Sequence, residues 1–172
     1  PMRRSLLEHK QGYYTTDEYV DDGVKLLRIT DLRENGNVDF SNCPQVSKLD
    51  TSLTSFELRN GDVVFARTGG AGSFGVIQGL SERAVFASYL IRFRFRHERF
   101  VNEYLRFVLG ADSFQKAVKQ NIHGGVNQNI HAEDIKSAYL AQPPLIEQRK
   151  IANFLDHETA KIDTLIAKQQ EL

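Results

Sequence analysis

Apolar and polar positions alternate with a period of two over several short segments in the first two thirds of the chain. The clearest case lies at 85–95, where Ile91, Phe93 and Phe95 point to one face of an extended strand and the intervening arginines point to the other. Shorter β-rich runs, bounded by turn signals such as Asn-Gly, predict further strands at 24–29, 63–66 and 74–78. The pattern predicts a β-rich body with tight turns.

The last third of the chain has mainly helical spacing. Apolar positions at 99–120 predict two helices separated at Gly110, followed by a polar loop at 121–135 and a final short strand at 135–140. Pro143 and Pro144 then open a segment without further Gly or Pro that consists mostly of good helix formers. We expect a helix over 143–172 of roughly 40 Å. The fold class is therefore α+β.

One apolar seam runs along this C-terminal helix at alternating spacings of four and three residues. This spacing is typical of a helix that pairs with another helix in a coiled coil, although an amphipathic helix packed on its own domain gives the same pattern. The length of the helix favours pairing. The residues expected to form the contact are Ile151, Leu155, Ile162 and Leu165.

Five segments, taken in order, resemble a known family. They are GVKLLRITDLRENGNVDF (23–40), LRNGDVVFARTGGAG (58–72), FASYLIRFRF (86–95), GGVNQNI (124–130) and PPLIEQRKIANFLD followed by KIDTLIAKQ (143–169). Only the last is specific by itself, but the ordered set covers nearly the whole chain. Together these segments resemble the DNA-specificity subunit of type I restriction-modification enzymes.

This resemblance implies a mostly antiparallel, β-rich target recognition domain over 1–142 and a conserved spacer helix over 143–172. Such subunits typically carry two recognition domains, each of which reads one half of a bipartite DNA target. The chain would be a non-catalytic, cytoplasmic recognition subunit that binds double-stranded DNA and directs adenine methylation and cleavage by methylation and motor-nuclease subunits. Those partners would hold S-adenosylmethionine, ATP and Mg²⁺, and this chain would hold no cofactor.

The resemblance covers only one recognition domain and one helix. We therefore expect a fragment of a longer subunit, or a half-length subunit, that pairs through the helix with a second recognition domain or a second copy of the chain.

Composition adds one difficulty to this interpretation. The chain has 22 Lys and Arg against 22 Asp and Glu, whereas a DNA-binding protein is expected to be basic. Basic residues concentrate at 83–119, which predicts a polarised molecule that meets DNA with one face. No apolar run approaches the ~20 residues of a membrane span, and the single cysteine, Cys43, excludes an intramolecular disulfide.

The residues expected to contact DNA fall into two groups. Basic side chains that would meet phosphates are Arg92, Arg94, Arg96 and Lys119, although an arginine row on a strand is also typical of a solvated face. Polar side chains that would reach a groove, where amides pair with adenine, are Arg67, Gln120, Asn121, His123, Asn127 and Gln128. Asn and Gly also simply form turns.

Catalytic patterns are incomplete. The glycines at 70–75 match a dinucleotide fingerprint, but a strand follows where a helix is required, so a glycine-rich hairpin connection is favoured. Gln142 to Leu145 resembles an amino-methyltransferase motif but lacks its aromatic residue. Asp134 and Lys136 lack a partner acid for a nuclease site, and the scattered histidines predict no metal site. The remaining alternative is a protein-interaction module that docks subunits without contacting bases, which net neutrality favours.

Overall fold

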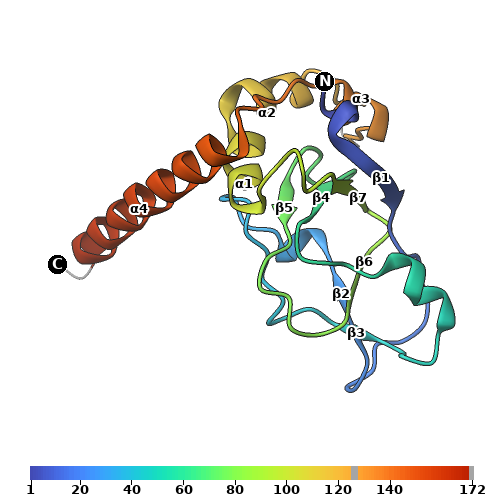
Figure 1. The fold of residues 1–172 in the computed structure, drawn as a ribbon. Coiled ribbons are helices and arrows are strands. Elements are labelled where there is room, and N and C mark those ends of the chain that lie inside the picture. Colours follow the sequence, from blue (N-terminus) through green and yellow to red (C-terminus); the bar gives the residue numbers. More distant parts are fainter. Residues whose placement is uncertain (125–127, 171–172) are drawn as a thin grey trace.

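The computed structural model describes residues 1–124 and 128–170, and it has the expected α+β architecture (Figure 1). The strands are β1 Leu6–Gln11, β2 Val24–Leu27, β3 Gln45–Val46, β4 Asp62–Ala66, β5 Phe74–Val76, β6 Ala84–Phe86 and β7 Leu90–Phe95. The helices are α1 Asn102–Gly110, α2 Asp112–Lys119, α3 Ala132–Ser137 and α4 Leu145–Gln170, and short 3₁₀ helices occupy Met2–Ser5, Ile29–Asp31 and Thr51–Phe56. Within the described ranges, no helix is both long and apolar enough to cross a membrane.

Two small sheets form the body. The first has the order β1-β7-β4-β5 and is antiparallel throughout, and the second has the order β3-β2-β6 with β2 and β6 parallel. The main core lies where the first sheet meets the helices, and in it the fully buried Phe65 packs against Phe93 and Phe114. The mostly antiparallel sheet is thus confirmed.

The alternating segment at 85–95 forms two strands, because a turn at Ala87 divides it. The Leu90 N–H donates to the Ala87 carbonyl at 2.9 Å. On either side of this turn the chain changes sheets, since β6 pairs with β2 whereas β7 pairs with β1 and β4. The alternation that predicted a single strand belongs to the residues after the turn, whereas residues 84–87 before it are uniformly apolar.

The strand predicted at 135–140 is wrong. The helix α3 lies there instead, and its start is closed by the Asp134 carboxylate, which accepts from the His131 N–H at 3.2 Å. Ile135 is the buried residue of this helix. The capped turn ends at Ser137, and residues 138–140 form neither helix nor strand. The division between α1 and α2 after Gly110 is as predicted.

The connection between β4 and β5 confirms the glycine-rich hairpin. Val63 pairs with Val76 and Phe65 with Phe74 on either side of it. Its three glycines, Gly69, Gly70 and Gly72, have φ of 68°, 143° and 90°, which residues with a Cβ rarely adopt. The chain thereby reverses in a short space and exposes the backbone of this connection next to Arg67.

Gln148 anchors α4 to the body. The helix begins directly after the proline pair, and the Gln148 side chain is fully buried. Its amide oxygen accepts from the Val101 N–H at 3.0 Å, and its amide nitrogen donates to the Arg99 and Pro143 carbonyls, both at 2.8 Å. These bonds join the start of α1 to the start of α4. The Gln148 side chain thus fixes the orientation of α4 relative to the body.

The buried part of α4 ends after about three turns. Ala152 is buried, Ile151 is half-buried against the main core, and Asp156 forms an ion pair with Arg106. From Thr159 to Gln170 every residue is exposed, and Figure 1 shows this part of the helix projecting away from the body. Ile151 therefore packs on its own domain, whereas Ile162 and Leu165 lie free of it.

We predict that Gln148→Leu lowers the free energy of unfolding by about 2 to 4 kcal/mol, because it leaves buried backbone groups at Val101 and Arg99 without a partner. Urea denaturation would measure the loss. Arg149→Leu, on the neighbouring exposed position, is the control and should change stability little. Equal midpoints for the two variants would contradict the anchoring role of Gln148.

Candidate nucleic-acid interface

Two adjoining hollows meet at Arg67, which lies directly after β4. One has a volume of ≈ 290 Å³ and the other ≈ 360 Å³, and both include Gln11 and Arg67. The first is completed by His9, Lys10, Ile91, His131 and Ala132, and the second by Tyr14, Thr68, Ser88 and Tyr89. None of these lining residues is acidic. The hollows together form a groove, the Arg67 groove, that suits an anionic ligand.

The Arg67 groove draws its lining from distant parts of the chain. Gln11 ends β1, Tyr89 lies in the turn between β6 and β7, and His131 precedes α3. Tyr14 and Tyr89 are 71% and 60% exposed, so both rings are accessible to a ligand. Sequence reasoning missed these four residues, because no local motif connects them and only the sheet pairing brings them together.

The polar loop predicted at 121–135 folds back onto Arg67. Asn129 forms a backbone bridge with Thr68, and two N–H to carbonyl bonds of 2.8 Å join it to His123. The His123 ring lies 6.0 Å from the His131 ring, and its Nε2 lies 3.7 Å from a carboxylate oxygen of Asp134. The loop thus places His123 near the Arg67 groove.

The other groove candidates divide by environment. Gln120 and Gln128 are exposed, so both amides are accessible. The Asn121 amide instead donates to the Ala117 carbonyl at 2.9 Å and closes the end of α2, which is turn chemistry. Asn127 lies outside the described residues.

Lys119, the last residue of α2, lies beside Gly72, at the end of the β4–β5 connection away from Arg67. The side chain is exposed, and its Cγ is a near neighbour of Gly72. It lines a third hollow of ≈ 380 Å³ together with Arg33 and Ser73. The connection therefore separates two basic positions, Arg67 and Lys119, on one region of the surface.

The arginine row on β7 does not form the expected phosphate-binding face. Arg92 is only 3% exposed, and its guanidinium donates to the Glu57 carbonyl at 2.9 Å and to the Glu8 carboxylate at 2.7 Å. Arg94 forms two bonds of 2.7 and 2.9 Å with the buried Asp62 carboxylate. These groups are committed inside the protein, which argues against the phosphate role predicted for both.

Environment shifts the pKa values of these two guanidiniums in opposite directions. Burial, and then the neighbouring charge of Arg94, lower the pKa of Arg92, whereas the hydrogen-bonded Asp62 carboxylate raises the pKa of Arg94. Arg96 differs from both, since its side chain is 43% exposed and lies 3.8 Å from a Glu98 carboxylate oxygen. Of the row, only Arg96 remains available to a ligand.

The expected basic face at 83–119 is also largely neutralised. Carboxylates pair with Arg83, Arg92, Arg94, Arg96, Arg106 and Lys116. A stretch that is basic in the sequence is therefore close to neutral on the surface, because Glu8, Glu57, Asp62 and Asp156 from elsewhere in the chain add to Glu98 and Asp112 within it. Charge counting along the sequence could not show these pairs.

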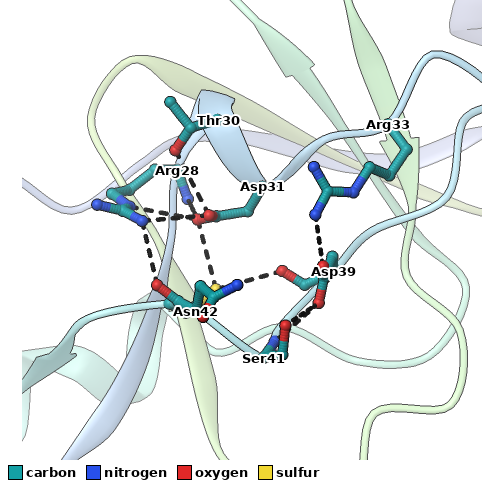
Figure 2. Close-up of polar contacts among 8 residues, drawn as sticks. Arg28, Thr30, Asp31, Arg33, Asp39, Ser41 and Asn42 are labelled. Atoms are coloured by element: carbon teal, nitrogen blue, oxygen red, sulfur yellow. Dashed lines mark hydrogen bonds and ion pairs between the residues drawn. The ribbon is translucent and has the colours of Figure 1, made fainter.

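A polar cluster supports the segment between β2 and β3. Figure 2 shows the buried Asp31 carboxylate at its centre, where it accepts from the Arg28 backbone N–H at 2.8 Å and from the Arg28 guanidinium at 3.2 and 3.3 Å. Asp39 binds the Ser41 hydroxyl and backbone N–H and pairs with Arg33. These contacts lower the pKa of Asp39. Because the cluster satisfies its own charges, it serves to hold the loop in shape.

Cys43 also contacts this cluster, through the Asp31 carboxylate. Its thiol is buried and lies 3.4 Å from an Asp31 carboxylate oxygen. Burial and the nearby carboxylate raise the pKa of the thiol to about 12. Because the pKa of the thiol is higher in the folded protein than in the unfolded chain, its contribution to stability is fully present below the ordinary thiol pKa. This contribution is lost only as the pH rises above that value. The thiol is therefore unsuited to nucleophilic chemistry near neutral pH.

We predict that iodoacetamide at pH 8 alkylates Cys43 in the folded protein at least about 100-fold more slowly than in urea, because the thiolate is scarce and shielded. Mass spectrometry would follow the reaction, and the single cysteine makes the signal unambiguous. Similar rates in both states would show that the cluster opens readily.

The chain is similar to one family of known proteins, in sequence and in structure. Residues 20–172 match the family described as "Type I restriction modification DNA specificity domain". The chain is 26% identical over 166 residues to the EcoKI specificity subunit of Escherichia coli (strain K12). The matched region covers 93% of this chain and 35% of that protein. It is also 26% identical over 164 residues to the MjaVIII specificity subunit of Methanocaldococcus jannaschii, covering 90% and 36%.

Solved structures share the fold. The HsdS subunit from Thermoanaerobacter tengcongensis matches with a TM-score of 0.69 at 16% identity, covering 95% of this chain and 42% of that one. A type I S subunit from M. genitalium matches with a TM-score of 0.64 at 15% identity, covering 96% and 40%. The chain thus spans about a third of the length of its curated relatives.

Proposed function

The chain belongs to the type I restriction modification DNA specificity domain family, and from this membership we propose that it recognises one half of a bipartite DNA target. In this proposal it catalyses nothing itself. It directs adenine methylation by methylation subunits and cleavage by motor-nuclease subunits, which supply S-adenosylmethionine, ATP and Mg²⁺. The chain contributes a reading surface and a helix.

The Arg67 groove is the observation that carries the proposal. A half-buried guanidinium lies in a groove whose lining contains amides, hydroxyls, exposed tyrosines and imidazoles but no carboxylate. Arginine and amide side chains are those that read base edges, and aromatic residues are common at recognition surfaces. A negatively charged, hydrogen-bonding ligand such as DNA suits this lining better than a neutral protein surface does.

The projecting part of α4 supports assembly with a further helix. Ile162, Leu165 and Ile166 are 53%, 63% and 48% exposed and share one face, on which Phe154 also lies. An exposed apolar stripe of this kind is expected to be covered. We infer that it pairs with an equivalent helix of a second recognition domain or of a second copy.

Mapping methylated adenines across a genome tests the reading role. The parent subunit with and without this domain, expressed with the methylation subunits, should give a bipartite motif only when the domain is present. Exchanging the domain for a relative's should change one half of the motif and leave the other half unchanged. An unchanged motif after the exchange would refute recognition by this domain.

The competing function is a module that docks subunits without touching bases, and the neutralised arginines favour it. Salt dependence separates the two, because a protein that neutralises phosphates loses DNA affinity steeply as salt rises. Binding of the assembled complex to DNA should fall by orders of magnitude between 50 and 200 mM salt, on the scale of roughly 10³-fold for six phosphate contacts. A flat response would favour the docking module.

A further inference from the structure

Arg67 is held differently from the other arginines of the body. Its backbone N–H donates to the Tyr89 carbonyl at 2.8 Å, and its carbonyl accepts from the Ile130 N–H at 3.0 Å. Its Nε then donates to the side-chain oxygen of Asn129 at 3.3 Å. Contacts from two separate parts of the chain, Tyr89 and the segment 129–130, therefore fix both the backbone and the plane of the guanidinium.

The outer edge of this guanidinium is unused. Among residues 1–124 and 128–170, no group bonds to the two terminal amino groups of Arg67, and no carboxylate pairs with it. Arg83, Arg92 and Arg94, by contrast, each have a carboxylate partner. Arg67 thus keeps a planar pair of donors and a full charge, in a groove without acidic lining.

The depth of Arg67 indicates what it meets. The residue is half-buried, whereas Tyr14 and Tyr89, which line the same hollow, are 71% and 60% exposed. Arg67 is therefore less exposed than the two tyrosines that line this hollow with it. Base edges exposed in a groove suit that position better than phosphates do, because phosphates meet the rim of a protein surface first.

A fixed pair of N–H donors selects among the bases. In the major groove, guanine presents two acceptors side by side, O6 and N7, whereas adenine replaces the first with a donor, and cytosine and thymine lack the pair. We propose that Arg67 reads a guanine through O6 and N7, with Asn129 as the residue that positions it. The proposal rests on the proposed DNA-recognition function and adds to it the base that this half-site contains.

Duplexes containing 7-deazaguanine test this directly, since that analogue pairs normally but lacks N7. The parent subunit, assembled with its methylation subunits, is titrated with target duplexes in which each guanine of the half-site is replaced singly. One position should weaken binding by roughly five- to 150-fold, the range of a good bidentate contact. Arg67→Ala should bind the unmodified duplex correspondingly more weakly and show no further loss at that position.

Two more variants keep the test independent of folding. Arg67→Lys retains the charge without the planar fork, so it should also lose sensitivity to 7-deazaguanine while keeping the salt dependence of binding. Asn129→Ala should reduce the sensitivity partly, because the guanidinium plane is freed. Arg59→Ala, an exposed arginine outside the groove, should retain the full sensitivity.

Each other outcome overturns the assignment. If Arg67→Ala weakens all sequences alike and lowers the salt slope by about one, Arg67 contacts a phosphate. If every variant retains the 7-deazaguanine effect, another residue reads that guanine. A parent complex that prefers no sequence at all would instead refute the proposed function, and this result is distinguishable because it precedes any substitution.

Discussion

Asp62→Ala should lower the free energy of unfolding by about 3 to 5 kcal/mol, the loss typical of a broken buried ion pair. Asp62 is 1% exposed, and its carboxylate accepts two bonds from Arg94 and one of 2.9 Å from the Arg59 backbone N–H. Without it, the Arg92 and Arg94 guanidiniums would share only Glu8, which is half exposed. Since domains are typically stable by about 5 to 15 kcal/mol, this loss would be a large fraction of the total stability.

Thermal and urea denaturation would measure this loss. Glu82→Ala is the matched control, because it removes a carboxylate from a surface pair with Lys25 and should cost at most about 1 kcal/mol. Asp62→Asn should recover part of the stability, since its amide oxygen can still accept from the Arg59 N–H. If Asp62→Ala and Glu82→Ala melted together, the buried network would contribute little.

Ile162→Asp should weaken helix pairing at least about 100-fold, because it removes a buried side chain and places a charge in the contact. The body should remain folded, since Ile162 is 53% exposed and lies in the part of α4 where every described residue is exposed. Sedimentation of the parent subunit would report association, and methylation of the bipartite target would report function.

Thr164→Asp provides the control for this substitution. It introduces the same charge on an exposed position of α4 that faces away from Ile162, so pairing should persist. Unchanged association in Ile162→Asp would sink the coiled-coil prediction and leave α4 as a helix without a partner on that face.

Local sequence signals predicted most of the elements, and the remaining ones depend on pairing between distant segments of the chain. The proline pair and the Gly110 break mark helix boundaries correctly because both act through the backbone of their own neighbours. The β6–β7 crossing and the strand β1 (Leu6–Gln11) were not predicted, since LLEHKQ does not alternate and pairing with β7 stabilises it. Capping of α3 is a local signal that the sequence offered and that strand propensity obscured.

The candidate site was less predictable for a related reason. Arg67 and His123 were identified from residue type and do meet near one groove, whereas Arg92 and Arg94 were identified by the same logic and are paired with carboxylates. The two groups of residues differ in whether a carboxylate from a distant segment pairs with the guanidinium. Glu8 and Asp62 supply such partners on β7, and no comparable group reaches Arg67 in the described residues.

The anchor at Gln148 also sets a mechanical tolerance. From Thr159 to Gln170 the free helix is about 18 Å long. Measured from the anchor, the helix end lies about 33 Å away, so a tilt of about 6° would displace the end by about 3.4 Å, one base-pair step. If α4 spaces two recognition domains along DNA, the three hydrogen bonds of Gln148, together with the buried Ala152 and the Asp156–Arg106 pair, decide whether the second half-site is met in register or one base pair out.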